Sequence, residues 1–143
     1  MSMEKILYKA DLPVFAQELA ARTADVAVFA LSGPLGAGKT TLVQSVLKHL
    51  GVTGPVQSPT YTYVSVYHLP NNKTIYHFDL YRIPSLDEFI VAGFDEYLYR
   101  PNSWCFIEWP EVILPLLKER TLCIALNYGQ TEDIRQMILS EIK

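Results

Sequence analysis

The sequence predicts an α/β fold in which a mainly parallel sheet is flanked by antiparallel strands and helices. Two short runs, residues 26–31 and 104–107, are continuously hydrophobic, which is typical of strands buried on both faces of a parallel sheet. A glycine-rich loop and a helix-like segment follow the first run directly. Paired strand-like runs around turn residues occur later in the chain, and they predict the antiparallel additions.

Length and composition favour one domain over residues 1–143. A chain of 143 residues is close to the usual size of a domain, and its 50% hydrophobic content is enough for a full core. The net charge of -3 argues against a protein that binds nucleic acid alone, because such proteins usually carry a basic excess. We therefore expect any contact with RNA to pass through a local patch or a partner protein.

The cysteines and the N-terminal residues predict a cytoplasmic protein. Cys105 and Cys123 each lie inside an apolar run and form no CxxC pair, so we interpret both as small buried hydrophobic residues in a reducing compartment. Glu4 and Lys5 occupy the place where a signal peptide would have its apolar segment. No apolar run approaches the ~18 residues of a membrane span, so no membrane contact is expected.

The first half of the chain begins with a helix signal. Asp11 and Pro13 mark a helix start, because proline is tolerated in the first turn. The buried strand at residues 26–31 is followed by a loop at 32–38 and a helix at 40–50, which Gly51 ends.

The second half alternates strands with short helical segments. Residues 62–67 and 74–79 are strand-like and flank a turn-like 70–73, which predicts a hairpin. Ser85 and Glu88 form a capping box, so a short helix is expected to begin there and to stop near Gly93. The remaining expected elements are a strand at 104–107, one or two helical turns at 110–117, and late strands at 122–128 and 134–139.

Residues 33–40 read Gly-Pro-Leu-Gly-Ala-Gly-Lys-Thr and match the phosphate-binding pattern G-x-x-x-x-G-K-[ST] in full. Glycines let the backbone curve around a phosphate chain, and the following helix adds its positive dipole end. Lys39 would reach the β- and γ-phosphates and the hydroxyl of Thr40 would ligate magnesium. The motif follows a buried strand and opens a helix, so it predicts a P-loop NTPase fold that binds ATP with Mg²⁺.

Two acids are candidates for orienting the metal or the attacking water. Glu108 ends the apolar run at 104–107, as a Walker B acid does, and Asp79 ends the strand-like run at 74–79. His77 shares a strand face with Asp79. The residues themselves leave open which acid does which task. Thr60, in the loop after the phosphate-loop helix, is a weaker candidate for sensing the γ-phosphate.

Four segments follow one another along the chain: residues 35–41, residues 58–61, the His-Phe-Asp-Leu-Tyr-Arg run at 77–82, and Glu-Trp-Pro at 108–110. Together they resemble the TsaE (YjeE) family, the bacterial ATPase of tRNA threonylcarbamoyladenosine biosynthesis. The resemblance implies a role in placing threonylcarbamoyl on the adenosine beside the anticodon of tRNAs that read ANN codons. It also implies that the protein acts through the TsaB and TsaD proteins, is not itself the transferase, and meets tRNA only in that complex.

The resemblance also implies roles for single residues. Lys39, Asp79 and Glu108 would be catalytic, Thr40 and Glu108 would hold Mg²⁺, and Asp79 would position the water. Thr41 would contact the α-phosphate, and Trp109 would lie close to the nucleotide or the partner, although it is as readily an aromatic plug over the sheet edge. The full nucleotide-binding set would be Pro34, Leu35, Gly36, Ala37, Gly38, Lys39, Thr40, Thr41, Thr60 and Trp109.

Two other functions use the same phosphate loop. A small-molecule kinase needs a lid with clustered arginines, and this chain has none. A nucleotide-gated binding module with incidental hydrolysis would use the same residues as the ATPase and stays open. A GTPase is disfavoured, since Ile75 stands where the guanine-reading N-K-x-D pattern needs an aspartate. Arg82 is the one candidate for an arginine near the γ-phosphate, so we expect slow hydrolysis alone and faster hydrolysis on the partner.

Overall fold

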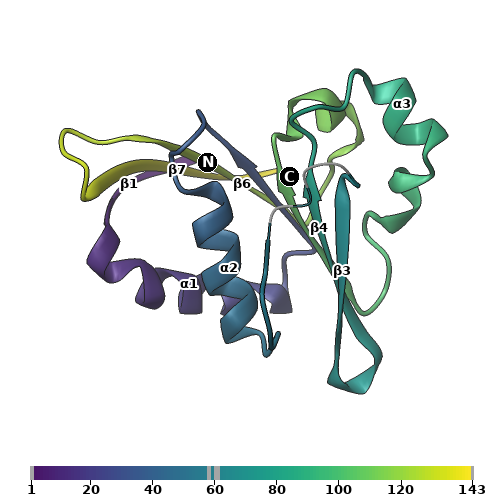
Figure 1. Cartoon of the computed structure of the whole chain (residues 1–143), viewed down its shortest axis with the longest axis horizontal. Helices are drawn as coiled ribbons and strands as arrows, with labels where there is room; N and C mark the ends of the chain where they lie inside the picture. The colour runs from purple at the N-terminus through teal and green to yellow at the C-terminus, as the bar shows by residue number, and fades with distance from the viewer. Residues whose placement is uncertain (1, 58, 60–61, 143) are drawn as a thin grey trace.

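A computed structural model describes residues 2–57, 59 and 62–142. Its seven strands form one sheet in the order β1-β7-β6-β2-β5-β4-β3 (Figure 1). The four central strands are parallel: β6 (Thr121–Tyr128), β2 (Val28–Ser32), β5 (Ser103–Glu108) and β4 (Lys73–Asp79). The outer strands, β1 (Ser2–Tyr8), β7 (Ile134–Ile142) and β3 (Val64–Leu69), are antiparallel to their neighbours. The predicted fold class is confirmed.

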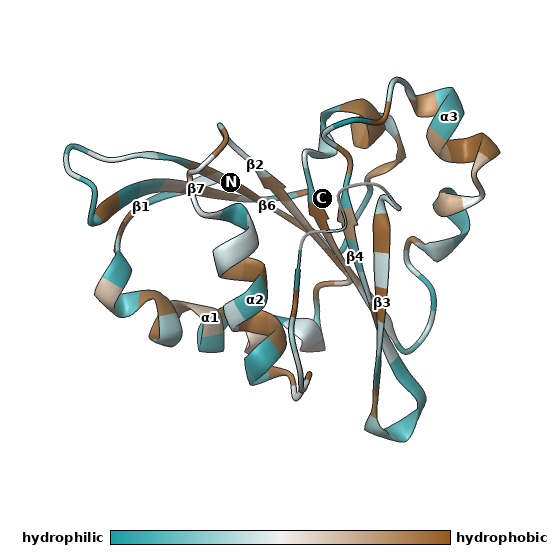
Figure 2. Ribbon diagram, in the orientation of Figure 1, coloured by the Kyte–Doolittle hydropathy of each residue, from teal (hydrophilic) through white to brown (hydrophobic). Residues whose placement is uncertain are grey.

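Two α-helices cover one face of the sheet. These are α1 (Leu12–Ala21) and α2 (Lys39–His49), and Figure 1 shows both on the same side. Their apolar faces pack on alternate residues of the central strands, among them Phe29 and Phe106, whose rings stack with centroids 4.6 Å apart. In Figure 2 the central strands carry long brown stretches, whereas α1 and α2 alternate brown and teal segments. The first buried layer of the core therefore lies between α1, α2 and the sheet.

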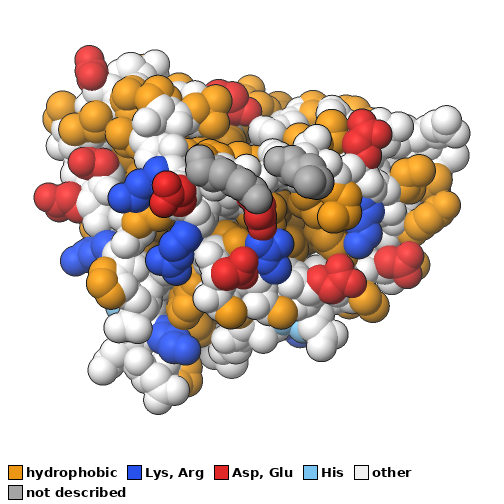
Figure 3. All heavy atoms as spheres, turned by 180° about the vertical axis from the view of Figure 1, so that it is seen from behind, with side chains coloured by type: hydrophobic (Ala, Val, Ile, Leu, Met, Phe, Trp, Pro, Cys, Tyr) orange, Lys and Arg blue, Asp and Glu red, His pale blue; other side chains and the backbone are white. Residues whose placement is uncertain are grey.

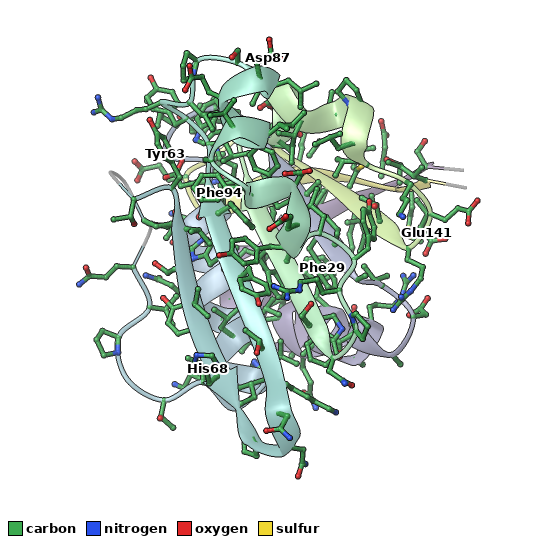
Figure 4. The ribbon with its side chains drawn as sticks, turned by 90° about the vertical axis from the view of Figure 1, so that its right-hand side faces the viewer. Phe29, Tyr63, His68, Asp87, Phe94 and Glu141 are labelled. Carbon is green, nitrogen blue, oxygen red and sulfur yellow. The ribbon has the colours of Figure 1, made fainter. Side chains whose placement is uncertain are left out.

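Short helices cover the other face over β4 and β5. They are α3 (Leu86–Val91) and the 3-10 helices η4 (Phe94–Tyr97) and η5 (Pro110–Leu116). Figure 4 shows Phe94 close to Tyr63, and their ring centroids are 6.3 Å apart. Three further 3-10 helices, η1 (Lys9–Asp11), η2 (Arg22–Ala24) and η3 (Pro70–Asn72), lie at connections.

Most elements lie where the sequence predicts them. The β3–β4 hairpin forms, and the Ser85 hydroxyl accepts a hydrogen bond of 3.2 Å from the Glu88 amide, as a capping box requires. Strand β1 was missed because it carries little hydrophobic signal: only Leu7 is buried. Cys105 is buried as predicted, and burial raises the pKa of its thiol to about 12. Cys123 is only half-buried, because it packs at the margin of the apolar cluster on the second face of the sheet, which includes Phe78, Phe89 and Ile113. In the described part of the chain, no helix is long and apolar enough to cross a membrane.

Gly33 is the point at which the phosphate loop leaves β2 and passes the backbone of β6. Its φ is +135°, and a β-carbon there would lie 2.0 Å from the carbonyl oxygen of Leu126. Such a distance is far inside van der Waals contact, so the loop or the strand would have to move. The close approach of loop and strand depends on this glycine.

Gly33→Ala is therefore expected to lower the free energy of unfolding by about 3–5 kcal/mol, from backbone strain together with overpacking. Gly51→Ala is the matched control, because Gly51 also has a positive φ, +100°, but open space around its β-carbon position. It should cost only about 1–2 kcal/mol. Urea unfolding of both variants measures the difference, and equal losses would show that the approach to Leu126 does not constrain the fold.

Candidate functional site

Residues 33–38 connect the end of β2 to the start of α2. Gly36 has a φ of 76° and Gly38, the N-cap of α2, has a φ of 106°, both in a region that side chains with a β-carbon disfavour. The first turn of α2 carries N–H groups without helical partners and the positive end of the helix dipole. This loop therefore has the backbone of an anion-binding site.

Two side chains from the end of the chain hold the loop from outside. The hydroxyl of Tyr128 donates to the carbonyl oxygen of Leu35, and Nε of Arg135 donates to that of Ala37 over 3.0 Å. The Arg135 guanidinium also lies 5.7 Å from the centre of the Tyr128 ring. Sequence reasoning missed both residues, because no local pattern marks a contact across more than 90 positions.

The side chain of Lys39 lies inside the site. The residue is 5% exposed, and its Nζ donates to the carbonyl oxygens of Gly33 and, over 3.0 Å, of Pro34. The same Nζ lies 3.8 Å from the centre of the Trp109 ring. Burial lowers the pKa of Lys39, and the nearby carboxylates, Glu108 first, oppose that shift. A compact positive charge thus lies at the loop, partly stripped of water.

Glu108 receives a hydrogen bond on each of its carboxylate oxygens. The hydroxyl of Thr40 donates to Oε1 over 2.6 Å, and Nε2 of His77 lies 2.6 Å from Oε2. Glu108 ends β5, Thr40 lies in the first turn of α2, and His77 lies in β4. Glu108 is only 2% exposed, so both oxygens are held in a protected setting. Sequence reasoning noted His77 but missed its contact with Glu108.

Asp79 lies beside Glu108 but in a different setting. The two residues pair in register at the ends of β4 and β5, and the Leu80 amide donates to the Glu108 carbonyl over 3.0 Å. Oδ1 of Asp79 accepts from the Tyr81 amide over 3.1 Å, which fixes the turn after the strand. Asp79 is half-buried, unlike Glu108. The strand ends thus present one enclosed acid and one more accessible acid.

These groups surround a cavity of about 520 Å³. Trp109 forms part of its wall with a left-handed backbone, φ 58°, and its ring lies 4.7 Å from that of Tyr81, centre to centre. Arg82 also lines the cavity, as the sequence-based hypothesis for a charge near the γ-phosphate requires. The complete lining is Leu35, Gly36, Gly38, Lys39, Thr40, Thr41, Asp79, Tyr81, Arg82, Glu108 and Trp109.

A second cavity, of about 300 Å³, lies on the other side of the phosphate loop. It shares Gly36, Gly38 and Thr41 with the first, so both cavities border the same part of the loop. Its other walls are largely apolar, with two basic side chains: Leu7, Lys9, Leu12, Ala37, Leu42, Leu126 and Arg135. A hollow of about 610 Å³ near Lys48 lies at the far end of α2 and contains no site residue. One cavity beside the loop is thus lined by several charged side chains, and the other is lined largely by apolar side chains.

The donors near Thr40 fit a hard divalent cation that is shared with a ligand. The Thr40 hydroxyl and Oε1 of Glu108 are adjacent oxygens at the cavity wall, and magnesium prefers oxygen. Within the described ranges, no group of three or more His, Cys, Asp or Glu residues could hold a metal ion by itself. Magnesium is usually bound by one or two carboxylates together with substrate phosphates, so this donor set suits a nucleotide-bound metal.

The structure brings together most of the predicted site residues. Lys39, Thr40, Thr41, Asp79, Glu108 and Trp109 line one cavity with Leu35, Gly36 and Gly38. Pro34 and Ala37 belong to the loop backbone, where Ala37 N donates to Pro34 O over 3.2 Å. Thr60 lies outside the described residues, so its predicted role stays a prediction. The weak guanine-reading pattern begins at Asn72, at the opposite end of β4 from Asp79.

Comparisons with known proteins agree on one family. A family model described as "Threonylcarbamoyl adenosine biosynthesis protein TsaE" matches residues 8–137. The chain is 43% identical over 98 residues to the tRNA threonylcarbamoyladenosine biosynthesis protein TsaE of Haemophilus influenzae, covering 68% of this chain and 61% of that relative. It is 40% identical over 100 residues to the protein of that name from Treponema pallidum, covering 70% of this chain and 72% of that relative.

The fold is also found among solved structures. The crystal structure of Bacillus subtilis YdiB matches with a TM-score of 0.76 at 26% identity, covering 100% of this chain and 87% of that one. The match supports the predicted P-loop NTPase fold. The aligned region spans only about three fifths of the Haemophilus relative, 61%, so statements about whole relatives come to this chain as proposals.

Lys39→Ala is expected to weaken binding of a magnesium nucleoside triphosphate by roughly 10- to 100-fold, since a charge-assisted contact to phosphate is lost. Lys48→Ala, at an exposed position on the same helix, should leave the affinity unchanged. Calorimetric titration with a non-hydrolysable ATP analogue measures both. Undiminished binding in a folded Lys39→Ala protein would contradict the assignment of the loop.

Proposed function

Because this chain belongs to the TsaE family of tRNA threonylcarbamoyladenosine biosynthesis proteins, we propose that it is a magnesium-dependent ATPase serving that modification. The observation that carries the proposal is the hydrogen bond between Thr40, in the phosphate-loop helix, and Glu108, at the end of β5. A threonine hydroxyl and a carboxylate are the residue types that would hold a nucleotide-bound metal, and their contact at the loop supports the proposal. Modification of tRNA also implies work in the cytoplasm.

The phosphate loop would hold the triphosphate. The backbone around Gly36 and Gly38 and the N-terminal end of α2 offer N–H groups and a positive dipole end to the phosphates. The amine of Lys39 would leave the carbonyl oxygens of Gly33 and Pro34 and turn to the β- and γ-phosphates. The Trp109 ring beside this amine would hold the amine close to the loop and shield it from bulk water.

Thr40 and Glu108 would hold Mg²⁺ together with the phosphates. When bound, the ion would offset charge that develops on the phosphate oxygens during cleavage. The carboxylate of Glu108 is already fixed by two hydrogen bonds, so little reorganisation is needed when the nucleotide arrives.

Asp79 would orient the attacking water. The side chain of Glu108 is enclosed and its Oε1 lies against the Thr40 hydroxyl, which suits a group that shares a metal with Thr40 more than a group that must accept a water. Asp79 is more accessible, lies beside Glu108 and lines the same cavity. The difference in setting between the two acids supports the assignment of the attacking water to Asp79. Arg82 lines the same cavity and would lie near the negative charge of the phosphates.

The second cavity would take the nucleoside. It shares Gly36, Gly38 and Thr41 with the phosphate cavity, which fits an α-phosphate contact at Thr41. Its apolar walls, Leu12, Leu42 and Leu126 among them, suit the flat face of a base. We therefore place adenine on the side of the loop that Arg135 borders.

The reaction on tRNA would belong to partners. Figure 3 shows acidic and basic side chains interspersed over the face seen there, with no large basic area, and the net charge is -3. A negative net charge and a face without a large basic area give little electrostatic attraction for the phosphates of RNA. We propose that the protein binds the TsaB–TsaD pair, that those proteins carry the threonylcarbamoyl transfer, and that ATP turnover resets them.

Substitution of the two acids separates their roles. Glu108→Gln should weaken magnesium-dependent nucleotide binding by roughly 10- to 100-fold, because an amide holds a hard cation less well. Asp79→Asn should keep the affinity and lower kcat by on the order of 100-fold or more, since orientation of the water is lost. Calorimetry and steady-state ATPase assays measure these effects, and the opposite pattern would exchange the two roles.

Nucleotide state should control the partner. We expect the TsaB–TsaD pair to bind the ATP form about 5- to 150-fold more tightly than the ADP form, the usual range of coupling between sites. Hydrolysis should also be faster in the complex, because Arg82 is the only arginine that lines this cavity among the described residues. Titration of the pair with ADP and then with a non-hydrolysable ATP analogue measures the coupling. Equal affinities would mean that nucleotide does not gate assembly.

A further inference from the structure

His77 is a polar residue in the most buried part of the sheet. It is 0% exposed, and its neighbours in β4, Tyr76 and Phe78, are buried hydrophobic residues. Burial of a polar ring costs free energy unless the ring is hydrogen-bonded. An apolar residue would fill the same space without that cost, so packing alone does not account for a histidine here.

Within the described part of the chain, the imidazole of His77 makes one hydrogen bond, to the carboxylate of Glu108. Nε2 lies 2.6 Å from Oε2 of Glu108, and a carboxylate can only accept, so Nε2 carries the hydrogen and donates. The other ring nitrogen, Nδ1, has no hydrogen-bond partner among residues 2–57, 59 and 62–142. In the described structure, the hydrogen bond to Glu108 is thus the one polar interaction of the His77 side chain.

Strand register makes this contact possible. His77 pairs with Phe106 across β4 and β5, and Asp79 pairs with Glu108 two residues further along. Since parallel partners share a sheet face, the His77 ring lies diagonally behind Glu108, on the side away from the cavity mouth. Thr40 approaches the carboxylate from α2, at the other oxygen. Each donor therefore binds a different oxygen of the Glu108 carboxylate.

We infer that His77 is a positioning residue for the metal site. By holding Oε2 it fixes the rotamer of Glu108, and Oε1 is left for Thr40 and the cation. The same hydrogen bond turns Oε2 toward His77, away from the cavity mouth, which fits Asp79 as the acid that receives the water. The inference rests on the proposed function, because it assumes that Glu108 holds Mg²⁺. Loss of such an outer contact typically costs 10–100-fold in metal affinity.

A pair of variants of similar length isolates the donor. His77→Gln keeps an N–H that reaches Oε2, whereas His77→Met fills comparable space without one. Affinity for ADP is measured by calorimetry twice, with Mg²⁺ and with EDTA, and the ratio gives the enhancement by magnesium. We expect His77→Met to reduce this enhancement about 10- to 100-fold and to leave the EDTA value unchanged. His77→Gln should retain most of the enhancement.

Two controls keep the outcome interpretable. Ile75→Val removes volume from the same strand face, two residues from His77, and should alter stability without altering the enhancement. If His77→Met fails to unfold cooperatively, His77→Asn replaces it, because its shorter amide stays polar but does not reach Glu108. The expected loss of enhancement is the same.

Each result decides between the inference and its premise. A wild-type protein whose ADP affinity is the same with Mg²⁺ and with EDTA would overturn the proposed metal site itself. A normal wild-type enhancement that His77→Met or His77→Asn keeps in full would overturn the role of His77 alone. A loss in His77→Gln as large as in His77→Met would also overturn it, because the donor would then be irrelevant.

Discussion

The hydrogen bond of 2.6 Å between Thr40 and Glu108 is the contact on which the arrangement of the site depends. It joins the first turn of α2 to the end of β5, two segments that are far apart in sequence. It forms only if β2 and β5 are neighbours and parallel, because α2 follows β2 and starts at the same edge of the sheet. The order of the strands in the sheet therefore determines where the carboxylate of Glu108 lies relative to the phosphate loop.

The parallel centre of the sheet also explains why chemistry gathers at one edge. Strands β2, β5 and β4 are parallel neighbours and end at the same edge of the sheet. The phosphate loop, Glu108 and Asp79, which lie at these strand ends, are therefore close together. Ligands of open α/β sheets bind outside the carboxyl ends of the strands for this reason. Strands β1, β7 and β6, on the side of β2 away from β5, bring Leu7, Arg135 and Tyr128 to the flank of the loop.

The sequence predicted those parts of the site that local chemistry determines. The glycines of residues 33–38, the lysine and threonine that follow, and acids at strand ends are recognised by spacing, and the structure brings them together. The contacts missed are long-range. Tyr128 and Arg135 reach the loop from the opposite end of the chain, His77 meets Glu108 only through strand register, and β1 depends on its pairing with β7 more than on its own residues.

A double-mutant cycle on Thr40 and Glu108 tests the central claim most directly. Affinity for a non-hydrolysable ATP analogue with Mg²⁺ is measured by calorimetry in wild type, Thr40→Val, Glu108→Gln and the double variant. If the two residues hold the metal as one unit, the double variant binds about as weakly as the weaker single variant, so the losses do not add. Losses that add in full would mean that the two residues act independently, which would contradict the account.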